Sequence, residues 1–245
     1  MAIPRAPTPL PAFRIAFQPI VDVDTGITIA QEALVRGPAG EGAGKVLDAV
    51  APGDRYRVDA AIRRAAVTEA QRLGLPATEA SLTLNFFPNS ADDPEHGLER
   101  TVAHAEAIGF PRDRLVFEIS EMEAVEDPQA LAAHLVPLQR RGLRIALDDV
   151  GTGHARMPLL LVWRPDGAKI AREVVMGLDL DPGRREHVRQ TLAQLAAFGL
   201  VPVVEGIETV GECRALRELG VRAMQGFLFA RPAIGILPAP VVPPL

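Results

Sequence analysis

Polar side chains close or interrupt the short apolar runs of this sequence, and most of them are acidic. Glu118 follows Leu115–Phe117, and Glu205 follows Val201–Val204. The whole set is Glu32, Asn85, Glu118, Asp148, Asp149, Lys169, Glu205 and Gln225. One such carboxylate is explained as well by a helix cap or a salt bridge, because burying a charge is costly only where nothing compensates it. Oxygen ligands at six strand ends predict one shared site instead.

The charge balance of this set predicts bound cations. It contains five carboxylates and one lysine, Lys169, so repulsion would raise the carboxylate pKa values unless divalent ions bind. Carboxylate and amide oxygens suit Mg²⁺ or Mn²⁺, and also Ca²⁺, whereas the lack of a Cys/His cluster disfavours structural zinc. The adjacent Asp148 and Asp149 could serve two ions. Paired ions activate water and stabilise a phosphoryl transition state, so the residues alone indicate a two-metal phosphoesterase.

The elements that must position these groups alternate between short apolar runs and longer amphipathic stretches. We expect strands at Arg14–Ile20, Ile27–Leu34, Ser81–Asn85, Leu115–Glu118, Arg144–Asp148, Ala168–Ile170, Val201–Glu205 and Ala223–Gly226. We expect helices at Asp54–Leu73, Pro94–Ala107, Pro128–Arg140, Arg184–Phe198 and Thr209–Leu219, with shorter ones near Pro158 and Arg172. This order predicts an α/β fold, a TIM-like (β/α)8 barrel whose strand ends meet at one mouth. An open doubly wound sheet is the alternative.

The first two expected strands require a modification of that barrel. Only Asp22–Gly26 separates them, which is too short for a parallel crossover, so we expect an antiparallel first strand. We read residues 13–236 as one barrel domain, preceded by a proline-rich extension, 1–12, and followed by a proline-rich tail, 237–245. The tail should be extended and mobile.

The composition excludes several classes of protein. The 245 residues are 48% hydrophobic and 23% charged, which excludes a disordered chain, a collagen-like repeat and a coiled coil. With 26 Lys and Arg against 31 Asp and Glu, the net charge of −5 disfavours direct nucleic-acid binding. The single cysteine, Cys213, allows no intrachain disulfide. We see neither a signal peptide nor a membrane span, so the expected location is the cytoplasm.

Eight sequence blocks then resemble a known family. Glu32–Arg36 reads Glu-Ala-Leu-x-Arg, the signature of the EAL domain family. Further similar blocks, in order, are Phe17–Ile20, Asn85, Phe117–Glu121, Leu147–Gly153, Lys169–Ile170, Val204–Thr209, and Gln225–Phe227 with Arg231–Pro232. The similarity runs from about Phe13 to Pro232, nearly the whole chain. It implies a barrel with an antiparallel first strand, and a cytoplasmic bacterial phosphodiesterase that opens cyclic di-GMP to linear pGpG with two Mg²⁺ or Mn²⁺ ions.

The resemblance also implies roles for single residues. Glu32, Asn85, Glu118 and Asp148 would hold one metal ion, which Gln225 supports, while Asp148, Asp149 and Glu205 would hold the other. Lys169 would touch the attacking water or the scissile phosphate, and it forms the catalytic set with Glu205 and Glu32. The substrate-binding candidates are Arg36 for a phosphate oxygen, Gln18 and Asp59 for guanine or ribose, and Leu34. A surface ion pair for Arg36 and a helix-face salt bridge for Asp59 remain alternatives.

In the family, an acid matching Glu121 pins the loop that carries the paired aspartates, here Asp149–Arg156. Gly151 and Gly153 would give this loop its conformational freedom. The loop also forms part of a homodimer contact, which could couple an upstream sensor or partner protein to metal binding. Glu208 could anchor a neighbouring loop or simply favour a helix N-terminus.

Three departures from the family pattern bear on activity. Val150 stands where the family has phenylalanine, and Ala171 stands where it has aspartate beside Lys169. Phe86 and Phe87 replace small polar residues, and they could stack on a base or pack under a helix. None of these changes removes an expected ligand. The alternative to the enzyme is therefore a weak or inactive EAL-type cyclic di-GMP receptor, or an interaction domain.

Overall fold

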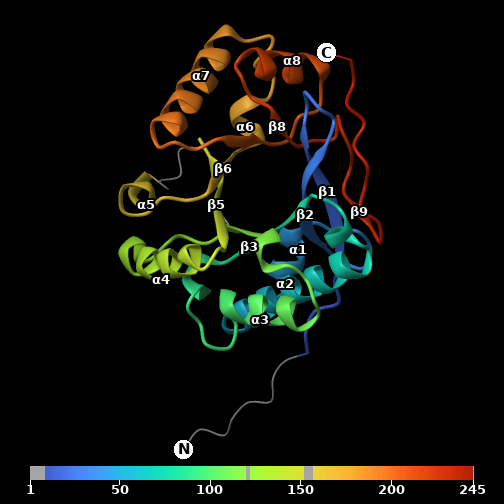
Figure 1. The fold of residues 1–245 in the computed structure, drawn as a ribbon, viewed down its shortest axis with the longest axis vertical. Helices are drawn as coiled ribbons and strands as arrows, with labels where there is room; N and C mark the ends of the chain where they lie inside the picture. Colours follow the sequence, from blue (N-terminus) through green and yellow to red (C-terminus); the bar gives the residue numbers. More distant parts are fainter. Residues whose placement is uncertain (1–8, 120–121, 152–156, 245) are drawn as a thin grey trace, which may run out of the picture.

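In the part of the chain that the structure describes, nine strands form one sheet, and the first eight of them close into a barrel. The computed structural model describes residues 9–119, 122–151 and 157–244. The strands are β1 (Arg14–Asp22), β2 (Thr28–Arg36), β3 (Ser81–Phe86), β4 (Leu115–Ile119), β5 (Arg144–Val150), β6 (Gly167–Ile170), β7 (Pro202–Val204), β8 (Ala223–Met224) and β9 (Ala233–Ile234). Figure 1 looks into the ring that they form.

The closure confirms the predicted TIM-like barrel with a reversed first strand. Strands β2 to β8 run parallel in chain order, while β1 is antiparallel to both β2 and β8. An open sheet is wrong, because β1 pairs with strands at both ends of the parallel series. The β1–β2 connection is a tight turn in which the Asp22 carboxylate accepts the main-chain amides of Asp24 and Thr25.

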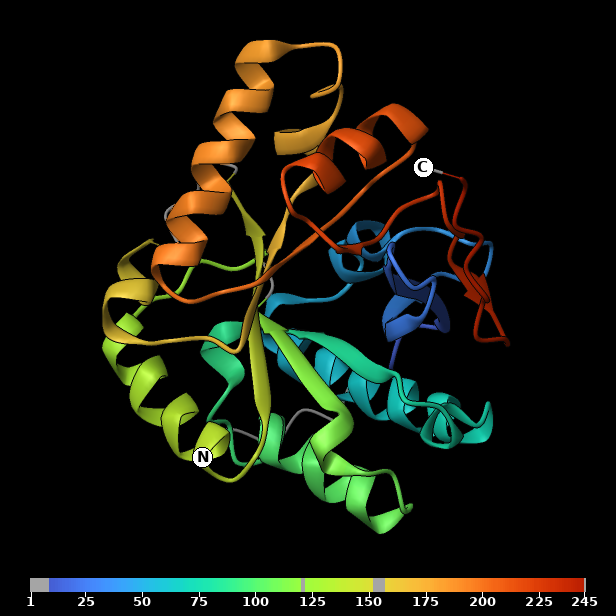
Figure 2. The same cartoon turned by 45° about the horizontal axis from the view of Figure 1, so that its top comes forward.

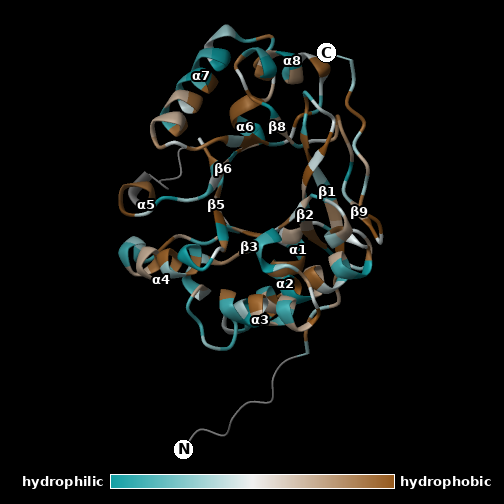
Figure 3. Cartoon of the chain, viewed as in Figure 1, coloured by the Kyte–Doolittle hydropathy of each residue, from teal (hydrophilic) through white to brown (hydrophobic). Residues whose placement is uncertain are grey.

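Helices surround the strands (Figures 1 and 2). They are α1 (Ala43–Asp48), α2 (Arg55–Arg72), α3 (Leu98–Ala107), α4 (Pro128–Arg140), α5 (Met157–Val162), α6 (Arg172–Val175), α7 (Pro182–Ala197) and α8 (Val210–Glu218). Their mixed colouring in Figure 3 is that of amphipathic helices lying on a barrel wall. Within the described part of the chain, no helix is long and apolar enough to cross a membrane.

Local hydrogen bonds explain where the helix boundaries differ from expectation. Helix α3 begins at Leu98 rather than Pro94, because the Asp93 carboxylate accepts the amides of Glu95 and His96 and holds them in a turn. Helix α7 begins at Pro182 rather than Arg184, since the Asp181 side chain caps it. Helix α1 and strand β9 were not expected.

The described part of the proline-rich tail, and the strand before it, lie against the barrel. Strand β9 adds to β1 through the pairs Ala16–Ile234 and Phe17–Ala233. Gln31 Nε2 then donates to the Pro238 carbonyl at 3.1 Å. The tail therefore contacts the barrel domain through Pro238 and Val241, and its mobility stays a prediction.

Candidate active site

Each of the eight barrel strands places one polar side chain in a common cluster. They are Gln18 from β1, Glu32 from β2, Asn85 from β3, Glu118 from β4, Asp148 from β5, Lys169 from β6, Glu205 directly after β7 and Gln225 directly after β8. Strand register sets the neighbours: Gln18 lies opposite Glu32, and Asn85 lies beside Glu118. The closed barrel therefore brings together residues that are up to 207 positions apart in the chain.

Lys169 lies at the centre of the acidic side chains. Its ammonium nitrogen is 2.9 Å from Glu118 Oε2, 3.2 Å from Glu32 Oε2 and 3.8 Å from Asp148 Oδ1, and it also pairs with Glu205. The lysine is only 2% exposed. One buried cation thus faces four carboxylates, which leaves the site with excess negative charge.

The pKa shifts follow from burial and from this imbalance. Burial is the largest effect and raises the pKa of Glu118 to about 8, although the Lys169 charge opposes it. Burial also raises the pKa of Glu205 well above its ordinary value. Burial lowers the pKa of Lys169, but the surrounding carboxylates outweigh it and hold the value well above normal. Carboxylates that resist ionisation at this density favour a divalent cation as their partner.

Two amide side chains hold the carboxylate of Glu32. Asn85 Nδ2 donates to Glu32 Oε1 at 3.1 Å, and Gln225 Nε2 donates to Glu32 Oε2 at 2.8 Å. Gln18 supports this arrangement, since its oxygen accepts from Gln225 at 3.4 Å and its nitrogen donates to the Ala230 carbonyl. The Glu32 carboxylate is therefore oriented from both sides.

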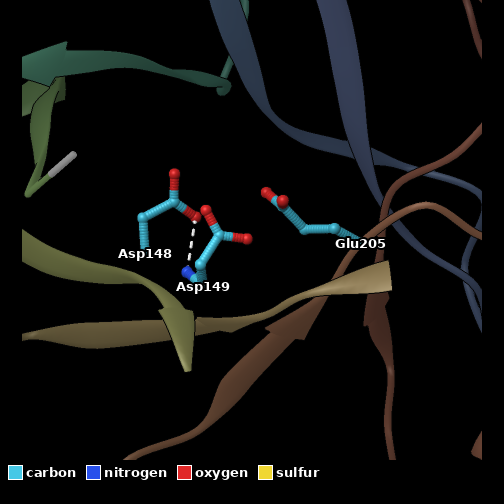
Figure 4. Close-up of side chains that lie close together, drawn as sticks. All are labelled: Asp148, Asp149 and Glu205. Carbon is cyan, nitrogen blue, oxygen red and sulfur yellow. Dashed lines mark hydrogen bonds between the residues drawn. The ribbon is translucent and has the colours of Figure 1, made fainter. Parts of the chain in front are cut away.

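Asp148 and Asp149 both turn toward the site, although they are adjacent in a strand. The β5–β6 register shifts between Leu147 and Val150, and Asp149 has a φ of 54°. This bulge carries both carboxylates toward Glu205, as Figure 4 shows. Ligand oxygens of the three residues lie within 4.8 Å of one another.

The donor set fits Mg²⁺ or Mn²⁺. Carboxylate oxygens of Asp148, Asp149 and Glu205 are close enough to share an ion, and Glu32 and Glu118 lie around the same lysine. These are hard ligands of the kind that such ions prefer. Residues in or next to four strands, β2, β4, β5 and β7, would thus hold the metal.

A cavity of about 190 Å³ adjoins this cluster. Its lining includes the substrate-binding candidates Leu34 and Asp59, together with Asn85, Asp148 and Asp149. The remainder is largely apolar, including Leu47 of α1, Ile62 of α2, Phe87 and Met122. An apolar recess beside a charged centre suits a ligand with a flat ring and an anionic group.

Comparison with known proteins places this arrangement in a family. A family model described as the EAL domain matches residues 8–232. The chain belongs to the EAL domain family. The structure of a standalone versatile EAL protein from Vibrio cholerae O395, in its c-di-GMP-bound form, has a TM-score of 0.86 and 31% identity, and the match covers 96% of this chain and 98% of that one. The manganese/cy-diGMP complex of Klebsiella pneumoniae BlrP1 has a TM-score of 0.83 and 29% identity, over 94% of this chain and 59% of that one.

Curated relatives of this EAL domain are longer proteins. The cyclic di-GMP phosphodiesterase RocR of Pseudomonas aeruginosa is 32% identical over 50% of this chain and 31% of its own length. The blue light- and temperature-regulated antirepressor BluF of Escherichia coli is 24% identical over 91% of this chain and 55% of its own length. The chain spans between a third and somewhat more than half of the first curated relatives it matches.

The remaining predicted residues of the EAL domain are less directly connected to the cavity. Arg36 is half-buried and donates to the Val35 carbonyl at 2.8 Å, and none of the residues described here forms an ion pair with it. Burial lowers the pKa of Arg36, while the Glu32 charge raises it. Gly151 has a φ of 100°, as a loop glycine would. Glu121 and Gly153 lie outside the described residues.

Side-chain contacts bear on two alternatives that the sequence left open. Phe86 and Phe87 are 0% and 4% exposed, and Phe86 meets Phe117 edge to face, so both are packed, although both also line the cavity. Glu208 anchors its loop, since its carboxylate lies 2.9 Å from Arg172 Nη2. The Arg172 guanidinium also donates to the Gly206 carbonyl.

Sequence reasoning missed one buried residue of the EAL domain next to the site, Arg63. It lies one helical turn after Asp59 and pairs with it. The signal was available, because an Asp and an Arg four residues apart share a helix face with the apolar Val58, Ile62 and Ala66.

Proposed function

We propose that this EAL domain is a metal-dependent phosphodiesterase that hydrolyses cyclic di-GMP to linear pGpG. The observation that carries the proposal is the convergence of Glu32, Glu118, Asp148 and Glu205 on Lys169, with Asp149 turned toward the same point. The name of RocR and the ligands of the BlrP1 complexes support this choice of substrate. Water adds across one P–O3′ bond: its oxygen joins phosphorus, and a proton goes to the leaving 3′ oxygen.

In this proposal the acidic side chains hold two Mg²⁺ or Mn²⁺ ions. Glu32, Asn85, Glu118 and Asp148 form one site, which Gln225 supports, and Asp148, Asp149 and Glu205 form the other. When bound, such a pair of ions activates water near neutral pH and offsets charge on the phosphoryl oxygens. The fit rests on the donor chemistry and on the 4.8 Å grouping of the Asp148, Asp149 and Glu205 oxygens.

The protein's own groups prepare the substrate for attack. The Lys169 ammonium, once the ions share its carboxylate partners, is placed to hydrogen-bond a phosphoryl oxygen and to stabilise its growing charge. Asn85 and Gln225 keep Glu32 oriented through hydrogen bonds of 3.1 and 2.8 Å. Arg36 would bind a phosphate oxygen. Leu34, Asp59 and Gln18 would contact a base or ribose.

We also propose where the protein acts, how it assembles and what controls it. A cytoplasmic location, a homodimer formed through the loop 149–156, and control by an upstream sensor or partner protein are all consistent with the family. Glu121, Gly151 and Gly153 would anchor and shape that loop.

A hydrolysis assay tests the proposed function directly. Purified protein is incubated with cyclic di-GMP and Mg²⁺ or Mn²⁺, with and without EDTA, and the nucleotides are separated by chromatography. We expect pGpG to form with metal and to vanish with EDTA. Tight binding without pGpG would reject the enzyme and support the receptor. No binding in calorimetry would support an interaction domain, the alternative that the name of BluF favours.

A further inference from the structure

Arg63 of helix α2 is a charged side chain held almost entirely inside the protein. It is 1% exposed and is among the largest fully buried side chains. Its guanidinium satisfies three separate acceptors: Nε donates to Thr101 Oγ1 at 3.1 Å, Nη2 donates to the His96 carbonyl at 2.5 Å, and Nη1 donates to Asp59. A buried guanidinium with three acceptors is fixed in position, and it places a positive charge next to the Asp59 carboxylate.

Asp59 and Arg63 both line the cavity beside the acidic cluster, and they are paired with each other. The Asp59 side chain is 11% exposed, and the residue lines the cavity with Leu34 and Asn85. Arg63 Nη1 and the Phe87 main-chain amide, the latter at 3.5 Å, both donate to Oδ2. Among the described residues no donor is assigned to Oδ1. The carboxylate is therefore held through one oxygen, and the other is left for a ligand in the cavity.

The electrostatic consequence concerns the protonation state of Asp59. Burial is the largest effect and raises the pKa of this carboxylate above its ordinary value, although the charge of Arg63 and the hydrogen bonds from Arg63 and Phe87 oppose the rise. An ionised carboxylate accepts hydrogen bonds only, whereas a protonated one also presents a donor. A base with adjacent N–H donors, such as the N1–H and 2-amino edge of guanine, needs the ionised form. Without the arginine, desolvation would favour the neutral acid.

We propose that Arg63 is a positioning residue that orients the Asp59 carboxylate as a hydrogen-bond acceptor in the cavity and so sets the preference of the cavity for a base with a two-donor edge, a role that rests on the proposed function. In this proposal the three acceptors of Arg63 occupy its guanidinium, so the ligand contact is made by Asp59. Arg63 acts through Asp59, and its contacts with Thr101 and the His96 carbonyl fix α2 against α3.

The test compares cyclic di-GMP with its inosine analogue, which lacks the 2-amino group. Affinities of the full chain for both are measured by calorimetry in EDTA, where the proposed hydrolysis does not run. We expect the wild type to bind cyclic di-GMP roughly tenfold or more tightly than the analogue, as expected for a lost hydrogen bond to a charged group. R63M should lose about tenfold in affinity for cyclic di-GMP and most of this preference. R63K should recover part of the affinity and part of the preference, since lysine keeps the positive charge but lacks the forked donors of the guanidinium.

Matched variants separate this role from a purely structural one. R64M changes the next residue of the same helix, which lines a different surface groove, and should keep the wild-type preference. D59N should resemble R63M in its preference. In the hydrolysis assay R63M should raise KM more than it lowers kcat. If R63M fails to fold, R63K and D59N decide the outcome.

The two proposals fail in different ways. A folded R63M or D59N with the wild-type preference would overturn the role of Arg63 while leaving the phosphodiesterase intact. A wild type that binds neither nucleotide would overturn the proposed function, and with it the role of Arg63.

Discussion

The main-chain amide of Asp149 donates a 3.0 Å hydrogen bond to Oδ1 of the preceding residue, Asp148. Adjacent side chains of a regular strand point to opposite faces, so these two carboxylates would normally be separated. The bulge between β5 and β6 and the φ of 54° at Asp149 turn both toward Glu205. A non-glycine residue in this conformation is uncommon, and here it stands directly beside the acidic cluster.

We predict that two replacements of Asp149 abolish activity alike but differ in thermal stability. D149N keeps a residue that tolerates this backbone but removes the charge, and D149G relieves strain of about 1 kcal/mol. Both should lose metal-dependent hydrolysis. D149G should also unfold about 2 °C higher than D149N in calorimetry. Full activity in D149N would show that this carboxylate does not serve the metal ions.

Glu32→Ala should abolish turnover, because the carboxylate that Asn85 and Gln225 orient would no longer hold its ion. The hydrolysis assay measures the loss of turnover, and a metal titration by calorimetry measures the loss of the ion. Glu79→Ala, at an exposed carboxylate remote from the cluster, is the matched control and should behave as the wild type. A wild-type rate in the Glu32 variant would remove this residue from the metal site.

Lys169→Met should destabilise the metal-free protein and inactivate it. Without the Lys169 ammonium, four carboxylates lose their shared cationic partner. This loss should lower the free energy of unfolding by about 3 kcal/mol or more. Mn²⁺ should then raise the melting temperature of the variant more than that of the wild type, since the ions replace the lost positive charge. Equal shifts in both proteins would show that lysine and metal do not share these carboxylates.

Glu212 of helix α8 should make stability depend on pH in the acid range. Its carboxylate caps the helix with Thr209 and accepts the Gly177 amide at 2.9 Å. Burial raises the pKa of Glu212, but the hydrogen bonds from Gly177, Glu208 and Thr209 outweigh it, and the pKa lies below its ordinary 4.5. The stabilisation is therefore complete above pH 4.5 and is lost as the pH falls through the lowered pKa.

Denaturant midpoints of wild type and E212Q check this pH dependence. E212Q should be less stable at pH 7 by about 1 kcal/mol, the usual contribution of a cap. The difference should shrink below pH 4.5. E218Q, at a more exposed carboxylate of the same helix, is the control. A difference that is constant with pH would show that the charge of Glu212 contributes nothing.

Ala171→Asp restores the family's acid beside Lys169. Ala171 occupies the N-cap of α6, a position that aspartate favours, so we predict unchanged or raised activity. Hydrolysis rates of the wild type and of the Ala171→Asp variant test this prediction. Because Ala171 is 1% exposed, a large fall in rate would show that its packing requires a small apolar side chain.

Much of the fold follows from local sequence. The five-residue link Asp22–Gly26 allows only an antiparallel hairpin, and β1 and β2 form it. Apolar runs that end in Glu118 and Asp148 predicted both the strands and the acidic mouth, since a buried charge requires a compensating partner. Strand β9 has only two residues and contacts β1 more than 200 positions away, so no local pattern predicts it.

What the sequence determined by itself was the kind of side chain offered at each strand end, because hydrophobic periodicity and turn length act over a few residues. Tertiary structure decided which of them meet. The contact of Gln225 with Glu32 spans 193 positions and depends on barrel closure. The turning of Asp149 depends on a bulge in pairing with β6, and the partners of Arg63 come from α2 and from two positions more than 30 residues later. Such contacts depend on register and packing across the whole barrel, which short-range patterns do not encode.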